Sequence, residues 1–403
     1  MPSSATDLPL ATSADVARSA ELAREAGRLG IDTEFMSEGR YKALLCLTQV
    51  AVEDPSEPTG IRTILIDGLS DDVDVSPLAA LLADPAIEII LHACRQDVTI
   101  LRRTWKTDIT NIFDTQVAAG FAGESAQAGY GNLLGSILKL KVGKTASYTR
   151  WDARPLSTEQ LLYAAEDVAH LLQLADELQR RLRSTGREQW AREECRRLEV
   201  LSDERDPETV WERLPRASSL DPTSRAVARR LAAWRERLAA AEDRPVGQVV
   251  QDAPLVEIAK RHPVNERALA DIRGIHPSII KRRGTGILEA IALGLNDPPI
   301  AREQVRGNSD SRDAPLIALA EALLRSRAMD AGLAYELLAS RSELEQIVSA
   351  ARLGLPEPEV RTLAGWRLEL VGAELEALLS GRMALSVEGR RRLELHELEQ
   401  SSD

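Results

Sequence analysis

The sequence predicts an α/β domain followed by all-α helical domains. Two observations predict this order. Up to about residue 185, short apolar runs alternate with segments of helical periodicity, and after that point the strand signals stop. The chain also has 403 residues, which is more than one ordinary hydrophobic core accommodates, so two or three domains are expected.

The first part of the chain should form a mixed sheet. The expected strands are Leu29–Phe35, Ala43–Val52, Arg62–Asp67 and Ala86–His92. A helix is expected from about residue 96 to 104. A longer helix is expected over Leu156–Leu182, because apolar residues recur there at helical spacing and Ser157 can cap the first turn. Strands that come first and then alternate with helices are typical of a mixed α/β sheet.

Breaks in these patterns divide the chain. The segment 187–214 is charged and helical in pattern, and the segment 297–313 contains two prolines, a glycine and several polar residues. The expected parts are an α/β domain at 1–185, a helical connector at 186–217, a first helical domain at 218–296, a linker at 297–313, a second helical domain at 314–395 and a tail at 396–403.

Composition excludes some classes of protein. A net charge of −12 excludes a nonspecific polycationic binder, although a pocket can still hold a few nucleotides. No run approaches the ~18 uncharged apolar residues of a membrane span, and the N-terminus lacks the pattern of a secretory signal. The three cysteines are scattered, so we expect neither disulfides nor a zinc site, and a reducing cytoplasm is the expected compartment.

A pair of acids in GIDTEF is the first candidate for chemistry. Asp32 and Glu34 are two residues apart in an expected strand, so both carboxylates lie on the same face. Adjacent carboxylates repel each other unless a cation lies between them, and this favours a metal site. A solvated strand end is the ordinary alternative for such a pair.

Two further segments add acids at defined places. In LHACRQDVTIL, Asp97 follows an apolar strand at the start of a helix, where an acid also stabilises the helix dipole. In YAAEDVAHLL, Tyr163 and Asp167 are four residues apart and lie on one helical face, while Glu166 should face solvent. A phenol and a carboxylate in this arrangement can orient a water molecule; a tyrosine packed on the sheet is the alternative.

The order of these segments resembles the DEDDy branch of the DnaQ-like 3′→5′ exonucleases. The segments GIDTEF, LHACRQD, IFDTQVAA, GYGNLL, WDARPLS and YAAEDV are similar to the ribonuclease D family over about residues 8–185. DRPVGQVVQDAPLVEIAKRHP and ALADIRGIHPSIIKRRGTGIL make the first helical domain similar to HRDC domains, and the second resembles them mainly in position and length. The resemblance implies a ribonuclease H-like mixed sheet with flanking helices.

The resemblance also implies an activity. Asp32, Glu34, Asp97 and Asp167 would hold two divalent ions, Mg²⁺ or Mn²⁺, and Tyr163 would position the attacking water. Two ions stabilise both the attacking and the leaving oxygen of an in-line displacement. The implied protein is a cytoplasmic monomer that removes nucleoside 5′-monophosphates from RNA with a free 3′ end, such as tRNA precursors.

Two other functions stay open from the residues. One is a DNA-directed 3′→5′ exonuclease of the same superfamily, since two-metal chemistry does not by itself select ribose. The other is a catalytically inactive RNA-binding adaptor, against which the complete set of acids argues. HRDC domains also occur in helicases, but the sequence has no G-x-x-x-x-G-K-[ST], so an ATP-driven motor is excluded.

Candidate RNA contacts fall in three places. The densest basic stretch of the first domain is Lys139, Lys141, Lys144, Arg150 and Arg154, for which a solvated loop is the alternative. Phe35 can stack on the terminal base, and Gln116 lies in the family-like FDTQ. In the first helical domain, Lys281, Arg282 and Arg283 are candidates, although basic residues near a helix end also favour the helix dipole.

Overall fold

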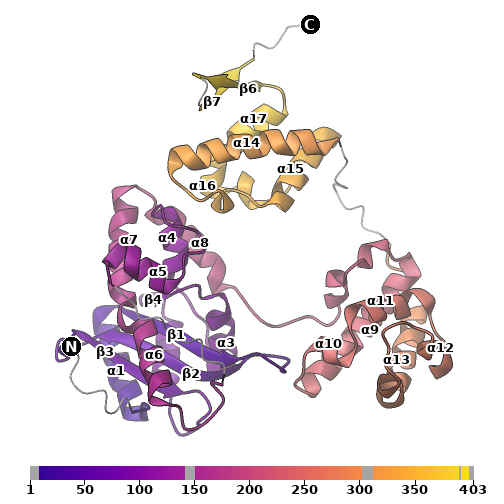
Figure 1. The fold of residues 1–403 in the computed structure, drawn as a ribbon, viewed down its shortest axis with the longest axis horizontal. Coiled ribbons are helices and arrows are strands. Elements are labelled where there is room, and N and C mark those ends of the chain that lie inside the picture. The colour runs from indigo at the N-terminus through magenta and orange to yellow at the C-terminus, as the bar shows by residue number, and fades with distance from the viewer. Residues whose placement is uncertain (1–8, 141–149, 302–311, 390–391, 399–403) are drawn as a thin grey trace.

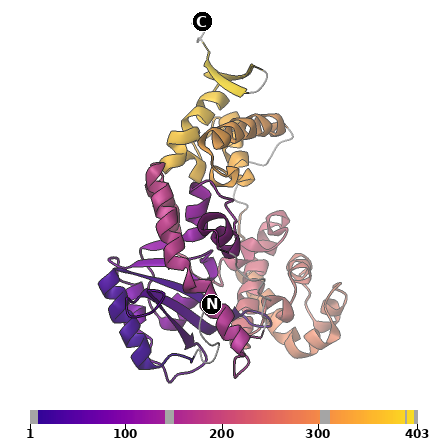
Figure 2. The same cartoon turned by 60° about the vertical axis from the view of Figure 1, so that its left-hand side comes forward.

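The computed structural model describes residues 9–140, 150–301, 312–389 and 392–398. Figure 1 shows an α/β domain and two separate groups of helices. The group nearer the C-terminus lies over one end of the α/β domain, and the other group lies to its side, joined by extended chain. Figure 2 shows the same arrangement after a 60° turn. The predicted order, an α/β domain followed by a helical region, is therefore confirmed.

A five-stranded mixed sheet forms the centre of the α/β domain, in the order β3-β2-β1-β4-β5. The strands are β1 (Arg28–Met36), β2 (Leu44–Glu53), β3 (Ile61–Asp67), β4 (Glu88–Leu91) and β5 (Ile112–Asp114). The central strand β1 pairs antiparallel with β2 and parallel with β4. Because β1 and β4 run in the same direction, their carboxyl ends lie at the same edge of the sheet.

Helices cover this sheet. They are α1 (Ser13–Ala26), α2 (Ser76–Leu82), α3 (Arg95–Trp105), α4 (Thr115–Phe121), α5 (Tyr130–Leu133), α6 (Thr158–Ala169), α7 (Leu171–Ser184) and α8 (Glu188–Glu199). A π-helical turn at Leu134–Leu138 follows α5. Helix α8 packs against β5 and α4, so the start of the expected connector lies on the α/β domain.

The long helix expected over Leu156–Leu182 is in fact two helices, so its predicted continuity was wrong. Ser157 caps α6: its hydroxyl accepts the Gln160 N–H at 3.2 Å, and the Gln160 side chain accepts the Ser157 N–H at 2.9 Å. The break between α6 and α7 falls at His170, whose φ of −116° and ψ of 10° leave the helical region. His170 is neither glycine nor proline, so the sequence carries no local signal of the break.

The first helical unit has a hydrophobic core of its own. Its helices are α9 (Pro222–Ala241), α10 (Val246–Val249), α11 (Asp252–Arg261), α12 (Glu266–Ala270) and α13 (Pro277–Asn296). Helices α9 and α13 meet at Gly294, where a Cβ would lie 2.5 Å from the Cα of Val227, so this approach requires glycine. Among the residues described, Tyr41 is the one member of the α/β domain that packs against this core.

The second helical unit ends in strands that the sequence analysis did not predict. Its elements are α14 (Asp313–Ala331), α15 (Arg341–Leu353), α16 (Gly365–Arg367), a π-helical turn (Leu368–Gly372), α17 (Ala373–Leu379), β6 (Met383–Glu388) and β7 (Arg392–Glu397). The expectation of helix throughout 314–395 was therefore wrong over β6 and β7, which form an antiparallel hairpin. The alternation of apolar and polar residues in this hairpin is short, and leucine and glutamate, which recur in it, are also good helix formers.

The second helical unit shares one hydrophobic core with the α/β domain. Trp366 stacks on Trp190 of α8 with ring centroids 5.0 Å apart, and it meets Phe121 of α4 edge-on at 5.1 Å. Beside it, the fully buried Arg367 donates to a carboxylate oxygen of Glu194 at 2.5 Å. These two parts of the chain therefore form one packed body, whereas the first helical unit is a separate one.

Within the described ranges, no helix is both long and apolar enough to cross a membrane. Cys46, Cys94 and Cys195 are free thiols, and all three are buried.

Candidate active site

The sheet brings three of the predicted acids to one edge. Asp32 and Glu34 lie on β1 beyond its pairing with β4, which extends to Gly30. Strand β4 ends at Leu91, and Asp97 follows in the first turn of α3. Because the carboxyl ends of parallel strands lie together, Asp97 comes close enough to Asp32 for their charges to interact.

Helix α6 brings the other two predicted residues to the same place. It packs across β1, β2 and β3. Tyr163 and Asp167 lie one turn apart on it, both half-buried, whereas Glu166 is exposed as the helical spacing predicts. The Tyr163 hydroxyl donates a hydrogen bond to Asp167, and its ring lies beside Trp151 with centroids 6.1 Å apart.

Burial and mutual repulsion dominate the electrostatics of these acids. The pKa of Asp32 is raised well above its usual value, first by burial and then by the charges of Asp97, Asp167 and Glu34. Burial, with the charges of Asp167 and Asp97, raises the pKa of Glu34 to about 8. Burial also raises the pKa of Asp97 to about 6 and that of Asp167 to about 7.

No basic side chain offsets this charge in the part of the chain that the structure describes. Asp32, Glu34, Asp97 and Asp167 form no ion pair with a described Lys or Arg. A cluster of carboxylates without a basic partner is costly, and a divalent cation is the usual counter-charge. The donor chemistry of the four acids therefore fits hard metal ions.

The side chains are not yet gathered as ligands of one ion. Across the described segments, no three His, Cys, Asp or Glu side chains lie close enough together to hold a metal. The Asp97 carboxylate accepts a hydrogen bond from the Thr33 hydroxyl. The four acids share one charged region, since the charges of Asp97, Asp167 and Glu34 all act on Asp32.

Sequence reasoning missed two neighbours of this region. Thr33, between Asp32 and Glu34 on β1, donates a hydrogen bond from its hydroxyl to Asp97. Tyr130 accepts the backbone N–H of His170 at 3.3 Å, and its pKa is raised first by burial, with Asp167 and Asp32 adding to the effect. The segment GYGNLL, which contains Tyr130, was the available signal.

The predicted RNA contacts of the α/β domain lie in varied surroundings. The Arg154 guanidinium binds Asp67 and the carbonyl of Cys46, and the Gln116 amide donates to the carbonyl of Ala128 at 3.1 Å. Phe35 is partly buried against the core. The remaining positions are Lys139, which donates to the carbonyl of Ser136, Arg150, which is exposed and paired with Asp152, and Lys141 and Lys144, which lie outside the described residues.

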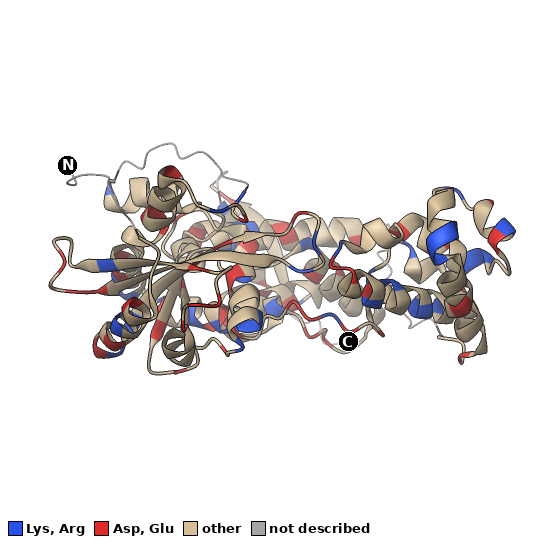
Figure 3. Ribbon diagram, turned by 90° about the horizontal axis from the view of Figure 1, so that it is seen from below, with Lys and Arg blue, Asp and Glu red and all other residues tan. Residues whose placement is uncertain are grey.

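The candidates in the first helical unit also differ among themselves. Lys281 and Arg282 are exposed on α13, whereas Arg283 is buried and bound to Glu242 at 2.8 Å. Figure 3 shows Lys and Arg recurring along the helices of this unit, with acidic residues between them. Basic and acidic side chains are therefore interspersed on this unit, and they do not form one continuous basic face.

Comparison with known protein families gives matches for the α/β domain and for the first helical unit. Residues 9–183 match the family model described as 3′-5′ exonuclease, and residues 224–291 match the HRDC domain. A ribonuclease D of Gluconacetobacter diazotrophicus is 38% identical over 391 residues, covering 95% of each chain. A ribonuclease D of Granulibacter bethesdensis is 35% identical over 387 residues, covering 94% of each.

A solved structure agrees with these matches. The crystal structure of Escherichia coli RNase D, described as an exoribonuclease involved in structured RNA processing, superposes with a TM-score of 0.81 at 27% identity. The match covers 92% of this chain and 98% of that one. The resemblance seen in the sequence is therefore confirmed: the chain belongs to the ribonuclease D family and is a 3′→5′ exoribonuclease.

Proposed function

We propose that Asp32, Glu34, Asp97 and Asp167 hold two divalent ions, Mg²⁺ or Mn²⁺, at the edge where β1 and β4 end. The supporting observation is the mutual repulsion of four carboxylates that have no basic partner among the described residues. When bound, the ions stabilise the attacking and leaving oxygens of an in-line displacement at the 3′-terminal phosphodiester.

Tyr163 has a positioning role in this proposal. Its pKa is raised above the usual value, first by burial and then by the charges of Asp167 and Glu34, so the phenol stays protonated near neutral pH. A protonated hydroxyl held by Asp167 can orient a water molecule but is a poor base. Water then attacks phosphorus, the upstream 3′ oxygen leaves, and the product is a nucleoside 5′-monophosphate.

We further propose that the substrate is structured RNA with a free 3′ end, such as a tRNA precursor. The similarity to Escherichia coli RNase D and the HRDC match support this choice. The DNA-directed alternative predicts equal hydrolysis of matched RNA and DNA 3′ overhangs. A preference of less than about tenfold for RNA, equivalent to about 1.4 kcal/mol, would favour that alternative.

We also propose that residues 314–395 form a second, divergent HRDC-like domain. The three free, buried cysteines support a reducing, cytoplasmic location. We also propose that the protein is a monomer, so analytical ultracentrifugation should show one species near 44.2 kDa.

The metal site is tested by removing single charges. Asp32→Asn and Asp167→Asn should each lower RNA hydrolysis by more than about a hundredfold, because loss of a ligand costs more than loss of a group that merely supports one. Their melting temperatures in EDTA should equal or exceed that of the wild type, since a repelling charge is removed. Glu166→Gln, which changes an exposed acid beside Asp167, is the matched control and should retain activity.

Metal removal gives a separate readout. EDTA should stop hydrolysis by the wild type, and added Mn²⁺ or Mg²⁺ should restore it and raise the melting temperature. Either asparagine variant turning over RNA at near the wild-type rate, in a preparation free of other nucleases, would exclude the assigned ligands. An inactive but RNA-binding wild type would instead support the adaptor alternative.

A further inference from the structure

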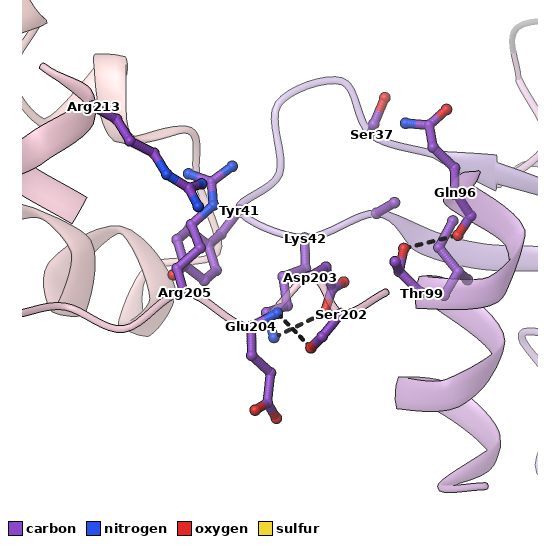
Figure 4. Close-up of a pocket in the computed structure, with 12 residues that line it drawn as sticks. Ser37, Tyr41, Lys42, Gln96, Thr99, Ser202, Asp203, Glu204, Arg205 and Arg213 are labelled. Atoms are coloured by element: carbon purple, nitrogen blue, oxygen red, sulfur yellow. Dashed lines mark hydrogen bonds and ion pairs between the residues drawn. The ribbon is translucent and has the colours of Figure 1, made fainter. Parts of the chain in front are cut away.

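A cavity of about 400 Å³ lies where the α/β domain meets the first helical unit. Ser37 reaches it from the loop between β1 and β2, and Gln96 reaches it from α3. Arg205, from the segment after α8, and Arg213, from the start of the first helical unit, lie on the other side (Figure 4). A volume of this size accommodates a nucleotide-sized group.

Two residues that line the cavity are close in sequence to the proposed metal ligands. Ser37 is three residues after Glu34, and Gln96 directly precedes Asp97. Both are exposed, and each carries a polar side chain that can donate a hydrogen bond. The end of β1 with the loop after it and the first turn of α3 therefore supply residues to both the acidic region and the cavity.

Three basic side chains line the cavity: Lys42, Arg205 and Arg213. The pKa of the Lys42 ammonium is lowered, first by burial and then by the charge of Arg103, while the charge of Glu204 acts in the opposite direction. Arg213 is exposed and forms no ion pair with any residue that the structure describes. A bound anion would supply a counter-charge to Arg213.

Two acids also line the cavity, and among the described residues neither forms an ion pair with Arg213. Asp203 is engaged in ion pairs with Lys42 at 3.3 Å and with Arg103. Figure 4 shows Glu204 pointing away from Arg205 and Arg213. Arg213 is therefore the basic side chain left to meet a ligand, and the exposed Ser37 and Gln96 are hydrogen-bond donors on the same cavity wall.

Polar contacts between the two bodies assemble this cavity. The Tyr41 hydroxyl donates to Glu236 of α9 at 2.8 Å, and Arg205 pairs with the same carboxylate at 3.4 Å. Arg40 pairs with Asp243, just after α9, at 2.7 Å. Glu236 is only 3% exposed. Since the first helical unit has its own core, these contacts set where Arg213 stands relative to β1.

We infer that this interdomain cavity binds a backbone phosphate of the RNA strand upstream of its 3′ end, through Arg213. The contact of Tyr41 with Glu236 is a positioning interaction that assembles the site. The inference rests on the exoribonuclease reaction proposed for the neighbouring acids, but binding can be measured without hydrolysis. A single strand contributes about 0.7 to the slope of log Kd against log salt for each phosphate contact.

The experiment uses the full chain and a strand of about ten nucleotides with a non-hydrolysable 3′-terminal linkage. Arg213→Gln should lower the salt slope by about 0.7 and weaken binding severalfold at low salt. Tyr41→Phe removes a hydrogen bond but no charge, and it should lower the slope as well, which a local effect on the loop would not do. Arg237→Gln, an exposed arginine of α9 paired with Glu208, is the matched control.

Hydrolysis adds a second readout. The ratio of kcat/KM on the longer strand to that on a dinucleotide should fall in Arg213→Gln and stay unchanged in Arg237→Gln. A wild-type salt slope in Arg213→Gln would overturn the inference, and a wild-type slope in Tyr41→Phe would overturn the assembly role. If AMP competes with the dinucleotide in the wild type but not in Arg213→Gln, with the slope unchanged, the cavity binds free nucleotide and not the strand.

Discussion

The Tyr163 hydroxyl and the Thr33 hydroxyl each hold one acid of the candidate site. Tyr163 donates to Asp167, and Thr33 donates to Asp97. A hydrogen bond to the charged form of a carboxylate lowers its pKa, so both bonds oppose the upward shift that burial produces. Neighbouring hydroxyls therefore keep these acids nearer to the charged state that metal binding requires.

Replacing Tyr163 by phenylalanine tests the role of its hydroxyl. Tyr163→Phe should lower kcat by about a hundredfold with little change in RNA affinity, because a misplaced water costs rate but not binding. Single-turnover hydrolysis and RNA binding, measured on the same preparation, check this split. An equal change in affinity and rate would instead indicate that Tyr163 contacts the substrate.

The spacing of acids was predictable, but their contacts were not. Alternation along a strand and the turn of a helix place Asp32 with Glu34 and Tyr163 with Asp167, since both depend on local geometry. The bond from Thr33 to Asp97 depends on side-chain rotation at a tertiary contact, and no sequence period encodes that. Likewise, the basic run around Arg154 suggested RNA, whereas this guanidinium binds Asp67, which is distant in the sequence.

Helix α15 is stabilised by contacts with residues that are close to it in the sequence and with residues that are distant in the sequence. Glu343 accepts the Ser340 N–H at 2.7 Å, closing a capping box, and accepts Arg361 side-chain bonds at 2.8 and 3.1 Å. Burial alone would raise the pKa of Glu343, but the bonds from Arg361 and Ser340 lower it to about 2. A depressed pKa stabilises the fold above the unfolded value, near ~4.3, and this stability is lost as the pH falls toward 2.

The pH dependence of unfolding tests this helix. Glu343→Gln should cost about 1–3 kcal/mol at pH 7, and the difference from the wild type should shrink between about pH 4.5 and 2. Denaturant unfolding followed by circular dichroism at several pH values measures it. Glu345→Gln, a change at a partly exposed acid of the same helix that pairs with Arg341, should alter stability by less than about 0.5 kcal/mol throughout.

Local signals also explain which elements were predicted. The helix cap at Ser157 and the long strands depend on residues that are close together in the sequence, so the sequence predicts them. The break at His170 and the hairpin of β6 and β7 are not, because each depends on packing against other parts of the chain. Leu385 and Leu395 of the hairpin, for example, pack on the second helical unit.

At the scale of the whole molecule, two hydrophobic bodies should unfold separately. Leu255→Ala, in the core of the first helical unit, should cost about 2–5 kcal/mol and shift only one thermal transition. Trp366→Ala, in the core shared with the α/β domain, should cost about 3–5 kcal/mol and shift the other. Calorimetry of the full chain, with the exposed change Leu353→Ala as control, measures both. One transition that moves with both substitutions would show a single cooperative unit.

The shared core around Trp366 has a consequence for folding during synthesis. Phe121 and Trp190, which contact Trp366, leave the ribosome well before Trp366 does, because the first helical unit lies between Trp190 and Trp366 in the sequence. At translation rates of about 5–20 residues per second, this apolar face waits roughly ten to thirty seconds for its cover. During that interval the nascent chain exposes an apolar surface that can aggregate. A chaperone that binds this surface, or a slow codon after the first helical unit, would therefore change the yield of active enzyme without changing its sequence.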